Sequence, residues 1–349
     1  METAIAFKIG VLSILSFLIA LAGTPLLTRF LHKYKMGKQL RDAAEAPVFA
    51  AMHKDKAGTP TMGGILIWGA TIILAVTFWG LTNLFPESFI SGYNFLTRPQ
   101  TLLPIGALLI CAILGFIDDY LGVRRIGPKG GGLSMKYRLL LYTVVAVFGA
   151  LWFYFKLDWD VFHIPFVGNF EIGWWYIPLF IAVIVATAFS VNETDGLDGL
   201  AGGTLATTFA ALGAISFAEG KFELATLCGV IMGALVAFLW FNINPAKFFM
   251  GDTGAMSLGV LVGVIAMLTN TALLLPVIGF IFVIESLSVI IQLLSKKFRH
   301  KKIFISAPIH HHLQAIGWSE PKIVMRFWLI SSITAVIGMI IFLIDKGWY

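Results

Sequence analysis

The stretch Val191-Asn192-Glu193-Thr194-Asp195-Gly196-Leu197-Asp198-Gly199-Leu200 places three carboxylates, an amide and two glycines between two apolar runs. Each of those runs is long enough to cross a bilayer. The two aspartates stand three residues apart and each is followed by glycine, so the segment can open a helix and present oxygens to a cation or a sugar. Equally, Thr194 or Asp195 can be a helix N-cap, with Asp198 in the first turn. The stretch alone leaves both interpretations open.

The chain as a whole has the composition of a polytopic membrane protein. Of its 349 residues, 58% are hydrophobic and only 13% are charged, and the mean hydropathy is +0.87. Ten apolar segments can be marked, most of them close to the ~20 residues that span a bilayer core. They cover residues 9–30, 63–81, 101–117, 139–157, 175–191, 200–217, 224–241, 255–268, 273–294 and 325–344. We therefore predict an all-α polytopic membrane protein of about ten transmembrane helices, in which Cys111 and Cys228 pack rather than form a disulfide.

The distribution of Lys and Arg predicts the orientation of these helices. Five loops hold 18 of the 25 basic residues, and the loops of the opposite side hold five. These five loops are residues 32–62, 118–138, 192–198, 242–254 and 295–324. The positive-inside rule places them in the cytoplasm and both termini outside. Because the net charge of +6 follows this topology, it does not indicate nucleic-acid binding. On the outer side, residues 161–166 and 169–172 can pair as a small hairpin.

The first cytoplasmic cluster precedes the second apolar segment. It reads Lys54-Asp55-Lys56-Ala57-Gly58-Thr59-Pro60-Thr61-Met62-Gly63-Gly64. Glycine, proline and threonine predict a tight loop, and its N–H groups, hydroxyls and lysines can hold phosphate oxygens near a helix N-terminus. The alternative is a positively charged turn at the membrane surface that binds no ligand.

A pair of aspartates, Asp118-Asp119, ends the third apolar segment. The 16 apolar residues before the pair rise about 24 Å as a helix, so the pair lies at the membrane–cytoplasm boundary. Two carboxylates at a helix C-terminus oppose the dipole, and at ~4 Å and an effective dielectric of ~20 they repel by roughly 4 kcal/mol. A bound Mg²⁺ would relieve this repulsion. Neutralisation by Arg124 and Arg125 is the alternative.

Two further loops are less specific. Residues 127–138 are rich in glycine and basic side chains, but they follow no strand and match no nucleotide-binding fingerprint. Residues 242–254 carry Asp252 just ahead of a helix, where an aspartate is usually a cap. Here the pair Phe248-Phe249 adjoins it, and we expect this pair to be exposed, with an aromatic face beside a carboxylate suited to a nucleobase.

The last cytoplasmic cluster is the triplet His310-His311-His312, after a basic run. Consecutive histidines do not share one helix face, and the i,i+4 spacing of helical zinc ligands is absent. We therefore expect hydrogen bonding to phosphate or sugar, or acid–base work, rather than metal binding. Glu285 lies inside the ninth apolar segment, where an acid is a functional candidate by default. It can equally be a structural partner of a neighbouring helix.

Taken together, the acidic, basic and histidine clusters converge on one membrane face. Carboxylates, Mg²⁺ and lysines are the components of phosphoryl transfer, where catalysis depends on positioning and charge neutralisation. An active site at the lipid boundary implies one substrate dissolved in the membrane and another in the cytoplasm. A multi-pass transporter is the alternative, but it would need polar residues near the bilayer midplane on broken helices, and apart from Glu285 and small hydroxyl residues the segments lack them.

The sequence closely resembles the phospho-N-acetylmuramoyl-pentapeptide transferase (MraY-type) family of the polyprenyl-phosphate N-acetylhexosamine-1-phosphate transferase superfamily. The resemblance covers the whole length, 1–349, as a single integral-membrane transferase domain. The stretches that carry it are Lys56-Ala-Gly-Thr-Pro-Thr-Met-Gly-Gly64, Gly115-Phe-Ile-Asp-Asp-Tyr120, Asn192 with Thr194-Asp-Gly-Leu-Asp-Gly-Leu200, Phe249-Met-Gly-Asp252, and Ala307-Pro-Ile-His-His-His312. The superfamily shares the acidic stretches, whereas the first stretch and the histidines resemble the muramoyl-pentapeptide branch.

The resemblance implies transfer of phospho-MurNAc-pentapeptide from UDP-MurNAc-pentapeptide to undecaprenyl phosphate, giving lipid I and UMP, with Mg²⁺. It implies a location in the bacterial cytoplasmic membrane among membrane lipid, and a homodimer. It also implies that the ninth helix bends to form a groove for the prenyl chain. The sister reaction with UDP-GlcNAc is the alternative within the superfamily. Between one-step attack and a covalent aspartyl-phosphate, we favour in-line attack, because a phosphate already carries a competent nucleophile.

The resemblance also implies roles for single residues. Asp252 would be the main metal ligand with Asp118 and Asp119 beside it, and Asp118 would deprotonate or orient the lipid phosphate. His310 would join these three in catalysis. The substrate-binding residues would be Lys56, Thr61, Lys136, Asn192, Asp195, Asp198, Asn242, Phe249, Gly251, His311 and His312. Within this set Phe249 would stack on uracil, Lys56 and Thr61 would contact phosphate or nucleoside, and the histidines would meet the sugar-phosphate.

The sequence departs from the family pattern at three places. Glu193 stands where an apolar residue is usual, and Gln314 replaces an acid that commonly follows the histidines. The run Gly130-Gly131-Gly132 is longer than expected, so the matching of Lys129 and Lys136 to the family's basic residues is open. None of these departures removes a predicted catalytic position.

Overall fold

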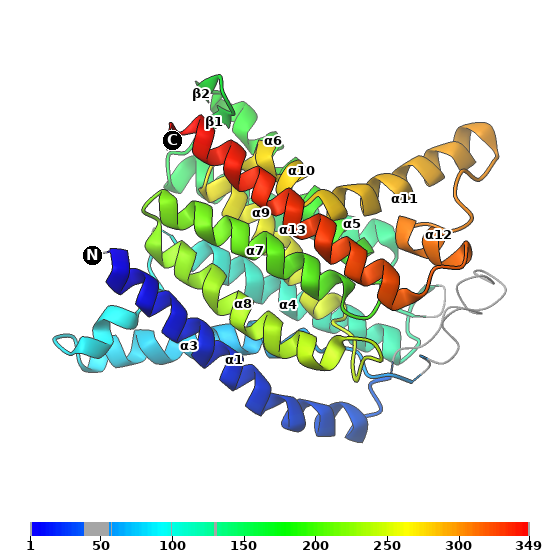
Figure 1. The fold of residues 1–349 in the computed structure, drawn as a ribbon, viewed down its shortest axis with the longest axis horizontal. Coiled ribbons are helices and arrows are strands. Elements are labelled where there is room, and N and C mark those ends of the chain that lie inside the picture. Colours follow the sequence, from blue (N-terminus) through cyan, green and yellow to red (C-terminus); the bar gives the residue numbers. More distant parts are fainter. Residues whose placement is uncertain (1, 38–55, 57, 99, 129–130, 348–349) are drawn as a thin grey trace.

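The computed structural model describes residues 2–37, 56, 58–98, 100–128 and 131–347, and it is a bundle of long helices with one β-hairpin (Figure 1). The long helices are α1 (Glu2–Lys33), α3 (Ile65–Leu84), α4 (Leu102–Val123), α5 (Met135–Lys156), α6 (Tyr176–Thr194), α7 (Leu200–Ala218), α8 (Phe222–Asn242), α9 (Asp252–Leu268), α11 (Phe280–Arg299) and α13 (Glu320–Asp345). The shorter elements are η2 (Phe89–Tyr93), β1 (Val161–Ile164), β2 (Gly168–Glu171), η4 (Gly173–Trp175), η5 (Ala272–Leu274), α10 (Leu275–Ile278) and α12 (Ile309–Ala315).

Nine of the ten predicted apolar segments each coincide with one helix of this bundle, and the segment 273–294 covers α10 with parts of η5 and α11. Eight of the described helices are long and apolar enough to cross a membrane. Spanning segments of this kind are helical because a helix satisfies all of its backbone hydrogen-bonding groups within one segment. The other two segments are not simple straight spans. The helix α9 has only 17 residues, and α10 and α11 meet at Gly279 with a bend of 88°. The predicted all-α polytopic fold is confirmed, as is the bend in the ninth segment.

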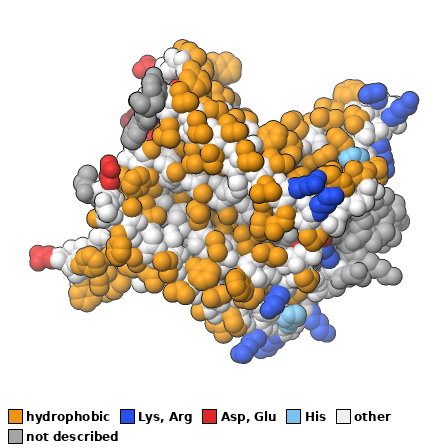
Figure 2. Space-filling view, viewed as in Figure 1, with side chains coloured by type: hydrophobic (Ala, Val, Ile, Leu, Met, Phe, Trp, Pro, Cys, Tyr) orange, Lys and Arg blue, Asp and Glu red, His pale blue; other side chains and the backbone are white. Residues whose placement is uncertain are grey.

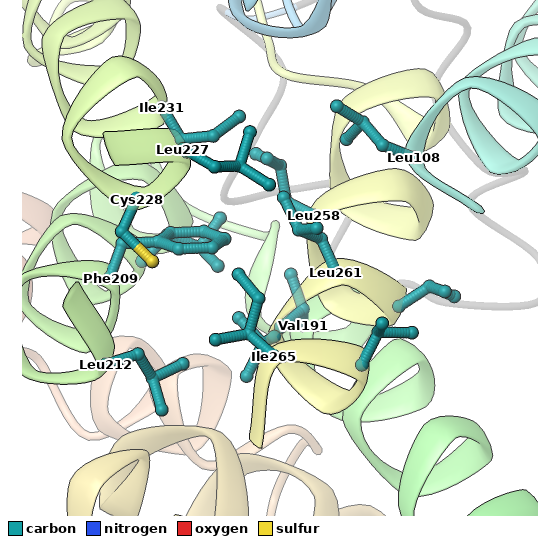
Figure 3. Close-up of a cluster of buried hydrophobic side chains, with 14 of the residues drawn as sticks. Leu108, Val191, Phe209, Leu212, Leu227, Cys228, Ile231, Leu258, Leu261 and Ile265 are labelled. Atoms are coloured by element: carbon teal, nitrogen blue, oxygen red, sulfur yellow. The ribbon is translucent and has the colours of Figure 1, made fainter. Parts of the chain in front are cut away.

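The core of the bundle is built around α9. Every residue of α9 after Asp252 is buried, because the helix is apolar on all sides and is covered by α4, α6 and α7. Figure 3 shows Leu258, Leu261 and Ile265 of α9 meeting side chains of α7 and α8. A Cβ atom at Gly259 would come within 2.8 Å of Ala188 Cα in α6, so this glycine permits the close approach of the two helices. The protein thus buries a short helix at its centre instead of exposing it to lipid.

The outer helices also pack through small residues. The helix α8 packs along α1, and a Cβ atom at Gly233 would collide with the backbone of Ser13. Close backbone contact of this kind is how helices associate in lipid, where the tails are as apolar as the side chains. Cys111 and Cys228 are buried and free in this packing, as predicted.

The two ends of the bundle differ in charge. In Figure 1, α1 begins and α13 ends at the left of the view, whereas α12 and the far end of α11 lie at the right. In Figure 2, Lys and Arg side chains gather at the right and Asp and Glu side chains stand at the left. The uneven distribution of Lys and Arg is the feature from which we predicted a cytoplasmic face. Which side of the membrane the basic end faces stays a prediction.

The predicted hairpin is confirmed. The strands β1 and β2 pair antiparallel, from Val161 opposite Glu171 to Ile164 opposite Gly168. The C-terminal end of α13 anchors it, since His163 Nε2 lies 2.6 Å from Asp345 Oδ2, and the Phe166 N–H donates to Asp345 Oδ1 at 2.5 Å. The hairpin therefore caps the end of the bundle opposite the clustered loops.

Candidate active site

The predicted acidic residues Asp118 and Asp252 come together around an arginine. Arg138, near the start of α5, forms ion pairs with both: its Nε lies 2.6 Å from Asp118 Oδ2 and its Nη2 lies 3.0 Å from Asp252 Oδ2. The side chain of Asp118 is 0% exposed and that of Asp252 is 18% exposed. A planar guanidinium suits this bridge because its donors form a fixed fork. We call these three residues the Arg138 cluster.

Asn192 completes the Arg138 cluster from the C-terminal end of α6. Its Nδ2 donates to Asp252 Oδ1 at 2.5 Å, and its Oδ1 accepts from Arg138 Nη1 at 3.2 Å. Asp252 is the first residue of α9, so its carboxylate also sits where the helix dipole favours negative charge. Four helices, α4, α5, α6 and α9, therefore converge on one polar centre.

Asp119 has a different environment from Asp118, although the two are adjacent. One of its oxygens accepts from Thr61 Oγ1 at 3.2 Å and the other from the Thr253 N–H at 3.0 Å. Thr61 itself belongs to a loop held in place by backbone pairing, in which the N–H groups of Gly63 and Gly64 donate to the 249–250 segment. Asp119 thus joins α4 to α9 and to the loop before α3.

A second cation lies between two carboxylates on the other side of this loop. Lys56 Nζ lies 2.6 Å from Asp198 Oδ1 and 2.5 Å from Glu320 Oε1. The Glu320 carboxylate also accepts from the Asp198 N–H at 2.7 Å, and Asp198 Oδ2 accepts from Asn244 Nδ2 and the Ala246 N–H. We call Lys56, Asp198 and Glu320 the Lys56 cluster. It ties the stretches before α3, α7 and α9 to the first residue of α13.

The two phenylalanines beside Asp252 have different exposures, which corrects the expectation that both are exposed. Phe248 is fully buried, with its ring centroid 5.8 Å from that of Phe238 and 6.1 Å from that of Phe241. Phe249 is half-buried, and Lys56 Nζ lies 5.8 Å from its ring centroid. Only Phe249 therefore offers a ring face to a ligand, next to a positive charge.

Asp195 and Asn242 both hold the loops of this region. Asp195 Oδ2 accepts from the Gly251 N–H at 3.1 Å. Asn242 is buried and joins two segments, because its Oδ1 accepts from the Gly199 N–H at 3.0 Å and its Nδ2 donates to the Phe248 carbonyl at 2.8 Å. These contacts place Gly251 directly beside Asp119, where a Cβ atom would collide with the carboxylate.

The three histidines lie on α12 and have three different environments. His310 is 0% exposed, and its Nδ1 lies 2.8 Å from Glu285 Oε2 in α11. Its burial, with the charge of Lys56 nearby, lowers the pKa of His310 to about 3. His311 Nδ1 lies 2.9 Å from Gln314 Oε1, so the departure at Gln314 provides a partner. His312 Nδ1 accepts from the Ile305 N–H at 3.3 Å.

The sequence matches known proteins along most of its length. Residues 101–270 match the model of glycosyl transferase family 4, and residues 56–67 match the phospho-N-acetylmuramoyl-pentapeptide-transferase signature 1. A phospho-N-acetylmuramoyl-pentapeptide-transferase of Bacillus subtilis (strain 168) is 37% identical over 343 residues, which is 98% of either chain. The chain belongs to the phospho-N-acetylmuramoyl-pentapeptide-transferase family. Others of that name include one of Chloroflexus aggregans, 38% identical over 90% of this chain and 84% of its own, and one of Bacillus anthracis, 38% identical over 93% and 95%.

Within the transferase family signature, Lys56 is the cation of the Lys56 cluster, and the Thr61 hydroxyl donates to Asp119. Two further residues of the site, Arg138 and Glu320, were absent from the predicted set. Lys136, which was predicted instead of Arg138, has an exposed side chain, two residues away along α5. Lys54 and Lys129 lie outside the described residues.

The described part of this transferase holds no group of three or more His, Cys, Asp or Glu arranged as a metal site. The donor chemistry nevertheless fits a hard cation. Asp118 and Asp252 present carboxylate oxygens to one positive centre, which in this structure is the Arg138 guanidinium. Mg²⁺ usually takes one or two carboxylates and completes its shell with water and substrate phosphates, so two carboxylates suffice.

Proposed function

We propose that this protein transfers phospho-MurNAc-pentapeptide from UDP-MurNAc-pentapeptide to undecaprenyl phosphate, giving lipid I and UMP for peptidoglycan biosynthesis. The observation that carries the proposal is the convergence of the Arg138 and Lys56 clusters at the basic end of the bundle, in a chain 37–39% identical to transferases of that name. The Arg138 guanidinium and the Lys56 ammonium can donate hydrogen bonds to a diphosphate, whose oxygens accept them and carry negative charge.

The reaction needs positioning more than covalent chemistry. An oxygen of the lipid phosphate attacks the sugar-linked phosphorus of the UDP-sugar, the bond from that phosphorus to the bridging oxygen breaks, and UMP leaves. Asp118 would orient the lipid phosphate and accept its proton. Arg138 and Lys56 would neutralise charge on the phosphoryl oxygens, and Phe249 would stack on uracil.

The same site would use Mg²⁺. Asp252 and Asp118 would hold the ion, which when bound supplies charge neutralisation on the diphosphate. Asp119, whose oxygens accept from the Thr61 hydroxyl and the Thr253 N–H, would stand beside them as the third predicted ligand. We expect Asp252→Asn to lose turnover that excess Mg²⁺ does not restore, whereas the control Asp160→Asn, near the hairpin, keeps it. A fully active Asp252→Asn variant would remove Asp252 from this role.

The proposal also covers location and partners. One substrate is a membrane lipid, so the site would face the cytoplasmic side of a bacterial cytoplasmic membrane, where the UDP-sugar is dissolved. The bend between α10 and α11 lies within the segment for which the resemblance implied a prenyl groove. A homodimer is part of the same expectation.

The decisive experiment measures UMP release by purified protein in detergent with undecaprenyl phosphate and Mg²⁺. UDP-MurNAc-pentapeptide and UDP-GlcNAc are offered separately, and the lipid product is followed in both cases. Release from the first substrate alone supports the proposal. Release from UDP-GlcNAc alone assigns the protein to the sister reaction, and release from neither, with folded protein, favours the transporter alternative.

A further inference from the structure

The end of the bundle at which α1 begins and α13 ends (Figure 1) has an open pocket of about 310 Å³. Its lining residues come from the turn between α7 and α8 and from the end of α13; they are Ala218, Glu219, Lys221, Phe342 and Lys346. Both α7 and α13 start beside the Lys56 cluster, and the 26 residues of α13 rise about 39 Å along the helix. Because that length is about the thickness of a bilayer, the pocket is separate from the candidate active site.

The pocket holds two ammonium groups and one carboxylate, which gives it a formal net charge of +1. Lys221 Nζ lies 2.7 Å from Glu219 Oε2 and donates to the Leu268 carbonyl at 2.6 Å, so one of its three N–H donors remains. Lys346 Nζ lies 3.7 Å from Glu219 Oε1, which is beyond hydrogen-bond distance, and it donates to no other described residue. Both lysines therefore have donors left for an anion.

These two lysines stand on the side of the membrane where basic residues are scarce. The loops of that side hold five of the 25 basic residues, and two of the five line this pocket. Basic residues of membrane proteins are concentrated on the other, cytoplasmic side, so a pair that meets here calls for an explanation. The turn also fixes their positions: Gly220, with a φ of 71°, lets the Lys221 N–H donate to the Ser216 carbonyl at 2.8 Å. Glu219 and Lys221 thus belong to a closed helix end.

Apolar side chains of α13 lead up to the pocket. Val336 and Leu343 are exposed and lie seven residues apart, so they share one face of the helix, and Lys346 follows Leu343 by three. The Phe342 ring forms a wall of the pocket, with Lys346 Nζ 5.7 Å from its centroid. A lysine at the end of a lipid-facing helix extends its ammonium group to the level of the lipid headgroups. The arrangement suits a ligand with an anionic head and an apolar chain.

We propose that this pocket binds the phosphate group of a membrane phospholipid, with Lys221 and Lys346 on the phosphate oxygens and an acyl chain along the Val336 face of α13. The single negative charge of a phosphodiester matches the net charge of the pocket, and its oxygens accept hydrogen bonds from both ammonium groups. Glu219 keeps the two lysines together and limits the pocket to a ligand of low charge. The site is independent of the proposed transfer reaction, because its lining residues belong to neither cluster.

The first test measures the ligand at the pocket itself. The purified protein in a nonionic detergent is treated with an amine-acylating reagent, and mass spectrometry of its peptides gives the acylation rate of each lysine. Phosphatidylglycerol should slow acylation of Lys346 about fivefold, whereas Lys156, an exposed lysine at the end of α5 on the same side, should change less than about twofold. Equal slowing at the two lysines would show attraction without a specific site and would overturn the proposal.

Two further additives identify the source of the phosphate. Diacylglycerol with the same acyl chains lacks the phosphate, and glycerol phosphate lacks the chains. Neither should slow acylation of Lys346 at the concentration at which phosphatidylglycerol acts. Equal protection by diacylglycerol overturns the phosphate contact, and equal protection by glycerol phosphate overturns the membrane lipid as its source.

The second test changes the charge of the pocket in both directions, with protection taken as the ratio of the Lys346 acylation rates with and without lipid. Glu219→Gln removes the carboxylate, so phosphatidylglycerol should protect at about one-fifth of the wild-type concentration. Lys221→Gln removes a cation and should raise that concentration about fivefold. Because Lys221 also holds the Leu268 carbonyl, the thermal stability of Lys221→Gln is measured alongside, and Glu219→Gln decides the test. If the three charges only fasten the helix ends together, Glu219→Gln gains no affinity for the lipid, and that result overturns the proposal.

Discussion

The Arg138 cluster and the Lys56 cluster have the same formal composition, one cation between two carboxylates, but they are built differently. In the Lys56 cluster, both carboxylates also accept backbone N–H groups, from Asp198 and Ala246, so the cluster fastens segments of the chain together. In the Arg138 cluster, Asp118 also accepts a backbone N–H, from Leu133 at 2.6 Å, but Asp252 accepts from two side chains, those of Asn192 and Arg138, and is partly exposed. Backbone contacts make a framework, whereas side-chain contacts can be exchanged for a substrate or an ion.

Loss of the guanidinium should have the largest effect on activity. Arg138→Gln leaves Asp118, which is 0% exposed, without its countercharge, and removes a cation from the reacting phosphates. We expect UMP release to fall about 100-fold, as when one stabilising donor is removed from an active site. Arg138→Lys keeps the charge but loses the fork, so its activity should lie between the two.

The control for Arg138 is Arg124, which has an exposed side chain and was one of the two arginines considered as neutralising partners of the aspartates. The structure assigns that task to Arg138, so Arg124→Gln should stay within about twofold of wild-type turnover, as expected of a surface charge. Equal losses in Arg124→Gln and Arg138→Gln would show that the cluster has no special role beyond net charge.

Breaking the Lys56 cluster should affect stability more than turnover. Glu320→Gln removes one of the two carboxylates around Lys56, whose side chain is 19% exposed, and should lower the free energy of unfolding by about 1–3 kcal/mol. We would measure the thermal inactivation half-life in detergent together with KM, because membrane proteins often unfold irreversibly. The loss of turnover should be smaller than in Arg138→Gln.

Glu219 offers a matched control at the opposite end of the bundle. The arrangement there is inverted, with one carboxylate between two lysines: Lys221 Nζ lies at 2.7 Å and Lys346 Nζ at 3.7 Å. Glu219→Gln should shorten the half-life without changing KM. If Glu320→Gln behaves identically, the Lys56 cluster is a framework only and does not contact substrate.

Much of the fold could be predicted because it depends on the length of apolar runs. Ten segments and the small hairpin around Val167-Gly168 follow from that and from turn chemistry, and the structure has them all. The central position of α9 was not predicted. Its spacing of Gly259 and Gly263, four residues apart, was the available signal, since small residues at this spacing mark a buried helix interface.

The site was predicted less completely, because it depends on helix register and on contacts between distant segments. Lys136 and Arg138 are about 200° apart on α5, so only one can face the bundle. The buried residues Tyr142, Ala146 and Ala150 follow Arg138 at intervals of four, and this stripe would have selected it. Nothing in the sequence near Glu320 indicated that it would meet Lys56, 264 residues away. The expectation that Phe248 is exposed was wrong. Adjacent side chains point in different directions, so Phe248 is buried while Phe249 is half-buried.

That difference between two neighbouring rings gives the smallest predicted effect. Phe249→Ala should weaken binding of the UDP-substrate by about 1 kcal/mol through lost stacking, which is roughly a fivefold rise in KM. Phe249→Leu keeps the bulk but not the aromatic face, so it should recover little of that loss. Phe248→Leu should act oppositely, destabilising the fold by less than about 1.5 kcal/mol while leaving KM unchanged, because that ring is fully buried. If KM is unchanged in Phe249→Ala, uracil binds elsewhere, and the half-exposed ring beside Lys56 is part of the framework with its neighbour.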